Sequence, residues 1–346
     1  MKKLRKFMCG LLVLTMMCVG VGCSSTSEDK DDKETKQEET SSKDTITITD
    51  HAGNKVTLPK KINRIAVCEI YPLPSVLSVF FNSADKIVGM SKESMVAAKN
   101  SLLGELYPEI LKADTSYMKD TEVNTEELLK LKPDVVFYGA SSPELGEKLK
   151  KAGFNAVAIS VNKWDYDCIE TLNQWIKLLS QIFPEEKDKV EKVENYSNEV
   201  YDKIQDKVKN LYDEDKAKVF FLFKYDETMM ATSGKKFFGN WWAESIGAKN
   251  VAEEVNKDNA VPTNMEQVYK WNPEQILITN FTTAQPKDLY NKAIGSNDWS
   301  KVDAVKNKKV YKMPLGMYRS YTPGVDTPMT LTIPCKNSLS RLVQKC

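Results

Sequence analysis

The sequence predicts an α/β fold with two lobes, each built on a mostly parallel β-sheet, joined by one long α-helix. Three observations lead to this prediction. Strand-like runs alternate with helical patterns before residue 185, a long amphipathic pattern follows, and the alternation resumes after residue 212. Such alternation is typical of βα units, in which each helix carries the chain back so that the next strand runs parallel. We therefore expect lobes at residues 45–184 and 213–346 and a linking helix at residues 185–212.

The first lobe opens with an expected β-hairpin. Thr45–Thr49 alternates polar and apolar residues, His51–Asn54 contains turn-forming residues, and Lys55–Leu58 supplies the second strand. Apolar runs and three- to four-residue spacings assign the remaining elements. The expected strands are Arg64–Cys68, Lys86–Met90, Asp134–Tyr138 and Asn155–Ser160, and the expected helices lie around Pro74–Phe81, Thr125–Leu131, Glu144–Ala152 and Tyr166–Ile182.

The linking helix is predicted from its apolar spacing. Between Val190 and Leu211 apolar residues recur at steps of three and four in a charged background, which is the pattern of an amphipathic helix. The second lobe then repeats the alternation of the first. Its expected strands are Lys218–Phe223, Met229–Thr232, Gln275–Thr279 and Lys309–Met313, and its expected helices lie around Phe238–Ile246, Met265–Lys270 and Lys287–Ala293.

The N-terminal segment reads as a targeting sequence. A basic start is followed by the uncharged apolar run Phe7–Val21, so residues 1–22 are predicted to be a secretory signal peptide. The ending Val19–Cys23 resembles a bacterial lipobox, which implies that Cys23 carries lipid and anchors the chain at the outer face of the membrane; plain secretion is the alternative. Residues 24–44 contain no hydrophobic residue, so residues 23–44 are expected to form a lipidated, solvated tether.

Composition disfavours several classes of function. With 49 Lys+Arg and 48 Asp+Glu the formal net charge is +1, so no bulk basic field exists to hold nucleic acid. The single histidine, His51, disfavours catalysis by histidine and metal sites of the His/carboxylate type. No G-x-S-x-G, HExxH or P-loop motif occurs. We therefore predict no catalytic residue, no metal ligand and no cofactor, although composition leaves a paired-carboxylate glycosidase open.

The seven cysteines do not form a paired CxxC pattern. Two lie in the expected signal peptide, Cys23 is the expected lipid site, and two lie in the last 15 residues. Outside these three segments only Cys68 and Cys168 remain. We expect two buried free thiols there, with a disulfide between them as the alternative.

An internal repeat links the two lobes. The pattern N-x-E-x6-P before a strand occurs at Asn124–Pro133 and again at Asn264–Pro273, with Glu126 and Glu266 at equivalent positions. One interpretation is local, because Asn caps a helix, Glu favours its first turn and Pro stops it. The other is that each lobe presents a similar surface with one glutamate.

Several motifs occur in an order that resembles the helix-linked (class III) periplasmic binding proteins of bacterial ABC importers. This family implies two Rossmann-like lobes joined by a single helix, and its members carry ferric siderophores, haem, corrinoids and some oxyanions. The resemblance covers about residues 45–332. The motifs are Ile46–Gly53 with Val56–Pro59, Arg64–Val67, Leu131–Val136, Gly239–Trp242 with Gly247–Ala252, and Trp271–Leu277.

The resemblance implies a substrate-binding lipoprotein, not an enzyme, that works as a monomer. It would capture a chelated metal complex, first of all a ferric siderophore, between its lobes and deliver it to a permease dimer with its ATPase. Corrinoid, haem or an oxyanion such as molybdate are alternative ligands. In this family one glutamate per lobe docks onto permease arginines, and by position these are Glu126 and Glu266. An extracellular hydrolase and a sensory or adhesion module remain alternatives of other classes.

The candidate ligand site lies in the cleft between the lobes, where strand-to-helix loops meet. Aromatic side chains there would offer flat faces to a large ligand, and Arg319 would offer a fixed cation to its anionic groups. Alternatively, both tryptophans belong to the core of the lobe, and Arg319 forms a surface salt bridge. The candidate residues are Tyr71, Tyr138, Trp241, Trp242, Phe281, Tyr318, Arg319 and Tyr321.

The last residues depart from the family pattern. Residues 332–346 contain Pro334, which would break the helix that ends members of the family. A reading frame shifted by one nucleotide can encode an amino-acid sequence close to that of the family's C-terminal helix. Our hypothesis is that residues 332–346 arise from a frameshift.

Overall fold

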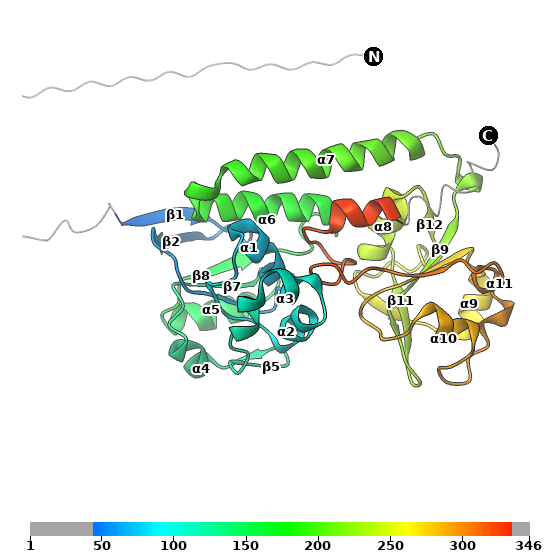
Figure 1. Ribbon diagram of the computed structural model, residues 1–346, viewed down its shortest axis with the longest axis horizontal. Helices are drawn as coiled ribbons and strands as arrows, with labels where there is room; N and C mark the ends of the chain where they lie inside the picture. Colours follow the sequence, from blue (N-terminus) through cyan, green and yellow to red (C-terminus); the bar gives the residue numbers. More distant parts are fainter. Residues whose placement is uncertain (1–43, 334–346) are drawn as a thin grey trace, which may run out of the picture. The chain divides into compact units, whose positions relative to one another are not determined.

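The computed structural model describes residues 44–333. The expected signal peptide, Cys23 and nearly all of the tether lie outside the described residues, as do residues 334–346 of the atypical tail. Two four-stranded sheets, one before and one after a long helix, organise the described chain (Figure 1). The α/β fold class predicted from the sequence is confirmed.

The first sheet has the strand order β4-β3-β7-β8, and every pair is parallel. β3, β7 and β8 are buried along their whole length. Continuous apolar strands of this kind are typical of a parallel sheet that is covered on both faces. The strands are β3 (Ile65–Val67), β4 (Ile87–Gly89), β7 (Val135–Gly139) and β8 (Ala156–Ile159), all within the expected runs or one residue beyond.

The helices of the first lobe begin at capping residues. Ser91, Asn124 and Asp167 each accept backbone N–H bonds at the start of a helix. The expected opening hairpin is confirmed as β1 (Thr45–Thr49) paired with β2 (Lys55–Pro59), whereas the pair β5 (Met118–Lys119) and β6 (Glu122–Val123) is too short to show a period. The helices are α1 (Leu73–Phe81), α2 (Lys92–Lys99), α3 (Leu102–Leu106), α4 (Thr125–Lys130), α5 (Pro143–Lys151) and α6 (Cys168–Ile182), of which α2 and α3 were not predicted.

The second sheet has the order β12-β9-β14-β15 and is also parallel throughout. The run expected as the second strand of this lobe is β11 (Met230–Ser233), and it does not join the parallel sheet. It pairs antiparallel with β10 (Lys224–Tyr225) and β13 (Ala260–Pro262), because a short turn returns the chain beside β10. The parallel strands are β9 (Lys218–Leu222), β12 (Lys249–Asn250), β14 (Gln275–Ile278) and β15 (Val310–Lys312). The helices are α8 (Phe238–Ser245), α9 (Met265–Trp271), α10 (Pro286–Tyr290) and α11 (Asp303–Lys306).

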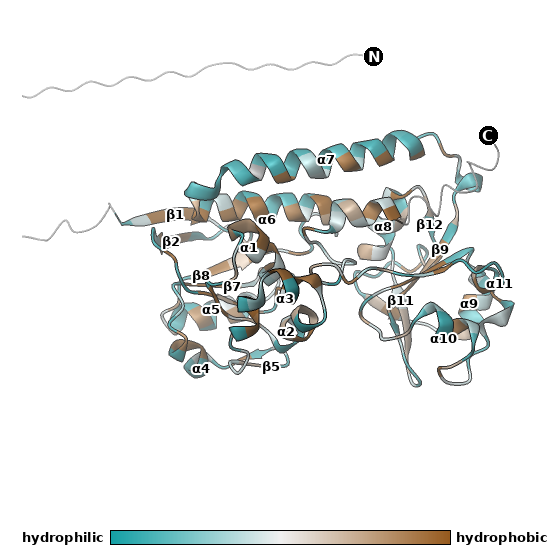
Figure 2. Cartoon of the chain, in the orientation of Figure 1, coloured by the Kyte–Doolittle hydropathy of each residue, from teal (hydrophilic) through white to brown (hydrophobic). Residues whose placement is uncertain are grey.

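The long helix α7 (Asp188–Val208) is shorter than the expected 185–212. A 3-10 turn at Pro184–Glu186 precedes it, since Pro184 can start but not continue a helix. Its apolar stripe packs first against the core of the first lobe through Val193 and then against the core of the second through Ile204 and Val208. Figure 2 shows α7 as mostly hydrophilic above the more hydrophobic α6.

The cores of the two lobes exchange side chains. Met317, which follows the last strand, packs in the core of the first lobe. Cys168 and Ile169, at the start of α6, pack in the core of the second. Backbone and side-chain hydrogen bonds join Leu102 N to Gly316 O (3.0 Å) and Ser101 Oγ to Met317 O (3.1 Å). Each lobe therefore contributes side chains to the hydrophobic core of the other.

Cys68 and Cys168 are both buried and free, as expected. Burial raises the pKa of both thiols, so each behaves as a small apolar core residue.

Candidate functional site

A cavity of about 240 Å³ lies where loops from the two sheets meet. The loop after β3 brings in Glu69, Tyr71 and Pro72, and the loops after β9 and β14 bring in Phe223 and Phe281. These positions follow from the fold, because loops at the carboxyl ends of parallel strands gather at one edge. The remaining lining residues are Val161, Phe237, Phe238, Tyr318 and Thr322.

Aromatic rings form most of the cavity wall. Phe223 stacks on Phe281 with ring centroids 4.7 Å apart, and its edge meets Phe237 at 5.8 Å. Tyr166 adds T-shaped contacts to Phe237 and Phe238 at 5.2 and 4.8 Å, and its hydroxyl donates to Asp258 O (2.9 Å). Rings held in mutual contact lose little conformational freedom when a ligand packs against them. The cavity therefore offers rigid apolar faces.

Arg319 places one cation beside this wall. Its guanidinium carbon lies 4.7 Å from the centroid of the Phe281 ring and 5.5 Å from that of Tyr318, and Nη1 is 3.4 Å from the Tyr318 hydroxyl. Among residues 44–333 no carboxylate lies within ion-pair distance of it. The surface salt bridge considered for Arg319 is not what holds it. The guanidinium of Arg319 is held by stacking on the rings of Phe281 and Tyr318.

Glu69 places one carboxylate in the cavity wall. Its φ of +65° lies in the left-handed region, which a residue other than glycine adopts at a cost. Its Oε2 is shielded from solvent and has no hydrogen-bond partner in the described chain. Gly139, at the end of β7, makes the room, because a Cβ there would lie 2.9 Å from Oε2.

The two phenols of the cavity are neutral hydrogen-bonding groups at physiological pH. Burial raises the pKa of Tyr318 to about 12. Burial also raises the pKa of Tyr71, helped by the charges of Glu93 and Glu69 and opposed by Arg319. Both can donate to an anionic ligand.

Lys312 fixes the loop that carries Phe281. Its Nζ donates to the carbonyl oxygens of Thr279 (2.8 Å), Thr282 (2.7 Å) and Ala284 (3.0 Å). An ammonium group has three donors, and here one loop accepts all of them. The sequence alone gave no sign of this role.

The predicted site residues divide into two groups. Tyr71, Phe281 and Tyr318 line the cavity, and Arg319 stacks on two of them. The other four do not line it. Trp242 and Tyr321 are fully buried in the core, where the indole Nε1 of Trp242 donates to Tyr321 O (2.9 Å). Tyr138 is buried beneath Gly146 of α5. Trp241 lines a neighbouring cavity.

That neighbouring cavity is larger, about 550 Å³, and more polar. Phe237 lines both cavities, so the two lie on either side of its ring or next to it. Its wall includes Asp165 and Tyr166, two consecutive residues with φ of +50° and +60°, together with Lys235 and Lys236. None of these four was predicted, since nothing in the local sequence sets them apart from loop residues.

The repeated glutamates are both exposed. Glu126 lies in the first turn of α4 and Glu266 in the first turn of α9, each after an asparagine cap. Neither carboxylate has an ion-pair partner in the described chain. Each helix is followed by a left-handed residue before the proline, Lys132 (φ +46°) and Asn272 (φ +41°). The repeat is thus a repeated local structure and leaves both glutamates accessible.

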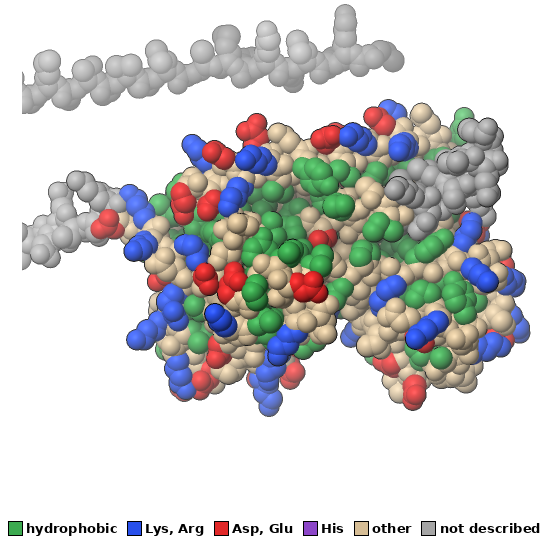
Figure 3. Space-filling view, in the orientation of Figure 1, with side chains coloured by type: hydrophobic (Ala, Val, Ile, Leu, Met, Phe, Trp, Pro, Cys, Tyr) green, Lys and Arg blue, Asp and Glu red, His purple; other side chains and the backbone are tan. Residues whose placement is uncertain are grey.

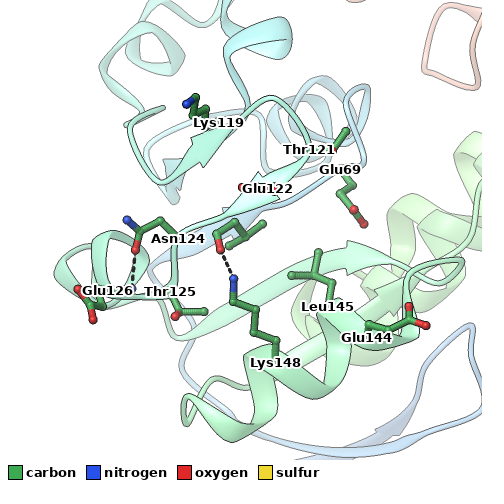
Figure 4. Close-up of a pocket in the computed structure, with 11 residues that line it drawn as sticks. Glu69, Lys119, Thr121, Glu122, Asn124, Thr125, Glu126, Glu144, Leu145 and Lys148 are labelled. Carbon is green, nitrogen blue, oxygen red and sulfur yellow. Dashed lines mark hydrogen bonds between the residues drawn. The ribbon is translucent and has the colours of Figure 1, made fainter.

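Glu126 also lines a wide cavity of about 810 Å³ on the first lobe. Figure 4 shows Glu126 and Glu69 at opposite sides of this cavity, with Lys148 donating to Val123 O between them. On the face of the molecule drawn in Figure 3, acidic and basic side chains are interspersed. This mixture agrees with the near-zero net charge.

Residues 44–333 also bear on metal binding and on membrane insertion. No group of three or more His, Cys, Asp or Glu is placed to hold a metal ion within this range. None of its helices combines the length and apolar character that crossing a membrane requires.

Comparisons with known proteins agree with the fold. A family model described as "Periplasmic binding protein" matches residues 83–315. The uncharacterized ABC transporter substrate-binding lipoprotein YvrC of Bacillus subtilis (strain 168) is 26% identical over 316 residues, 90% of each chain. The molybdate-binding protein MolA of Haemophilus influenzae is 26% identical over 287 residues, 77% of each chain.

Solved structures show the same architecture. A periplasmic solute binding protein from Veillonella parvula DSM 2008 superposes with a TM-score of 0.75 at 29% identity, covering 84% of this chain and 85% of that one. MolA bound to molybdate superposes with a TM-score of 0.71 at 24% identity, covering 86% of this chain and 93% of that one. The latter likeness concerns the fold alone.

Proposed function

Because the chain belongs to the periplasmic binding protein family and is an extracytoplasmic substrate-binding protein of an ABC importer, we propose that its cleft captures a chelated metal complex and delivers it to the permease. A ferric siderophore is the first candidate. The relatives are binding proteins of transporters and not enzymes, which speaks against the hydrolase alternative. A sensory or adhesion module would share the fold but would lack neighbouring permease and ATPase genes.

The observation that carries this proposal is the pairing of an aromatic cavity with Arg319. A bare transition metal needs several nitrogen, oxygen or sulfur ligands, whereas this wall consists mainly of phenylalanine and tyrosine rings. A chelate brings its own ligands and presents flat organic faces outward. The rings suit those faces, and the guanidinium suits anionic oxygens of the chelate.

An oxyanion is the second candidate, and a specific observation supports it. MolA, similar over most of its length, is a molybdate-binding protein, and Arg319 is a cation that such a ligand would use. Haem and a corrinoid remain candidates because the rings would stack on either macrocycle.

A ligand panel tests these candidates. Tryptophan fluorescence is recorded while ferric siderophores, haem, cobalamin and molybdate are titrated into the protein. We expect saturable binding of a ferric chelate in the micromolar range or tighter. Binding of molybdate alone would identify the ligand as an oxyanion rather than a chelate. Binding of none of these ligands would overturn the proposal.

Delivery requires docking, and we propose Glu126 and Glu266 as the docking groups. Two exposed carboxylates, one on each lobe and without ion pairs in the described chain, would meet basic pockets of the two-fold permease. Lipid on Cys23 would keep a monomeric protein beside that permease.

Charge reversal tests the docking proposal. The double variant Glu126→Lys, Glu266→Lys should bind ligand like the wild type but abolish uptake in cells. The matched control reverses Glu127 and Glu253, which already pair with Lys130 and Lys249, and should retain uptake. Uptake that persists in the first variant would remove the docking role.

A further inference from the structure

The aromatic cavity is flanked by two opposite charges that have no ion-pair partner among residues 44–333. Glu69 follows β3 of the first sheet and lines the cavity. Arg319 follows β15 of the second sheet and stacks on the cavity residues Phe281 and Tyr318. Tyr71 lies in the field of both charges, which act on its phenol in opposite directions. A ligand seated against Tyr71 would therefore meet an anion at one end and a cation at the other.

The carboxylate of Glu69 has one oxygen without a partner in the described chain. Its Oε2 is shielded from solvent without a hydrogen bond, which costs free energy unless something else pairs with it. Its backbone is held at φ +65°, and Gly139 leaves space where a Cβ would press on Oε2. Packing alone would favour an apolar side chain here, since the surrounding wall is mainly carbon.

The surroundings of Glu69 select the kind of partner. Phenylalanine and tyrosine faces attract cations through the ring quadrupole, and a carboxylate beside them adds a charge-assisted hydrogen bond. A bare oxyanion would instead be repelled by Glu69, whose charge acts across a wall that is mainly carbon. Glu93 on α2, the other carboxylate that acts on Tyr71, would add to this repulsion.

We propose that the ligand presents an ammonium or similar cationic nitrogen group to Glu69 while its anionic oxygens face Arg319, which makes Glu69 a specificity-determining residue. This inference rests on the proposed function, because it takes the aromatic cavity as the ligand site. It narrows the ligand to a chelate that carries both charges.

A pair of probes that differ in one charge tests the inference. Ferric desferrioxamine B carries a free ammonium group on a hydroxamate chelate, and its N-acetylated derivative has the same chelate without that charge. Calorimetric titration of the wild type should give about tenfold tighter binding of the ammonium form, the size expected for one charge-assisted hydrogen bond. The isosteric variant Glu69→Gln should bind both probes equally. The control Glu144→Gln, an exposed carboxylate that lines the other first-lobe cavity, should keep the tenfold preference.

The outcomes separate the two proposals. If the wild type binds both probes equally, or if Glu69→Gln keeps the preference, the role of Glu69 is overturned while capture of a ferric chelate stands. If the wild type binds neither probe, the role proposed for Glu69 is overturned, and the ligand panel alone decides whether a ferric chelate binds. If Glu69→Gln gains molybdate binding that the wild type lacks, the exclusion of oxyanions by Glu69 is supported directly.

Discussion

His51 should make the stability of this protein depend on pH in a narrow window. Its Nδ1 accepts a hydrogen bond from Ser160 N (3.2 Å), and its ring meets the Trp164 ring edge-on with centroids 4.9 Å apart. Burial lowers the pKa of His51 from 6.5 to about 4, although a hydrogen bond to the Gln174 backbone opposes this. The folded state therefore keeps the ring neutral where the unfolded chain already binds a proton.

The sign and size of the effect follow from the two pKa values. Between pH 6.5 and pH 4 the unfolded state holds more protons, so stability falls as the pH is lowered through this window. From pH 7 to pH 5 the loss attributable to His51 is about 2 kcal/mol, worked from one proton and the two pKa values. Burial raises the pKa of Asp167 and Asp326, and these carboxyls act in the opposite direction because the folded state then binds the proton more tightly.

A matched variant isolates the histidine. In His51→Asn the amide oxygen can take the place of Nδ1 as acceptor from Ser160 N, but the side chain does not titrate. Urea unfolding followed by tryptophan fluorescence at pH 7 and pH 5 gives the change in unfolding free energy for each protein. The contributions of Asp167 and Asp326 cancel in the comparison, and the wild type should lose about 2 kcal/mol more than the variant. Equal losses, within about 0.5 kcal/mol, would refute the assignment to His51.

Four further predictions concern the cleft, the core and the tail. Arg319→Met should weaken binding of an anionic ferric chelate by about tenfold or more at unchanged thermal stability, measured by calorimetry and a melting curve; unchanged affinity would remove Arg319 from the site. Lys312→Met should weaken the same binding by freeing the loop that carries Phe281, and recovery in Lys312→Arg would identify the hydrogen bonds rather than the methylene chain as the cause. Trp242→Ala should cost about 3–5 kcal/mol in urea unfolding because the side chain is fully buried, and a cost below about 1 kcal/mol would contradict its place in the core. Resequencing the coding DNA should reveal a shifted frame at the start of residues 332–346; an intact frame supported by close relatives would reject the frameshift hypothesis.

The fold could be predicted because its signals are local and periodic. Continuous apolar runs gave β3, β7 and β14, and the three- to four-residue spacing gave α7, whose stripe joins both cores. The run that became β11 was placed in the wrong sheet, because strand propensity says nothing about which neighbour a strand takes.

The site was predicted less completely, for physical reasons that differ by residue. Tyr71 and Tyr318 lie in segments that follow predicted strands, and loops at the carboxyl ends of parallel strands gather at one edge of a sheet. Phe223 does not stand out, because it ends an apolar run that reads as core. Trp241 and Trp242 are adjacent on a helix and so point about 100° apart, and only the packing of α8 decides where each one goes. Glu69 was not among the candidate residues, because its buried oxygen and its left-handed backbone depend on the tertiary structure.

The exchange of core side chains between the lobes has a consequence for unfolding. Met317 fills space in the first lobe, and Cys168 and Ile169 fill space in the second, so neither half of the chain encodes a complete interior. A fragment cut at α7 would expose apolar surface from both sides and would tend to aggregate. Heat should therefore melt residues 44–333 in one cooperative transition, although the sheets are formed by separate stretches of sequence.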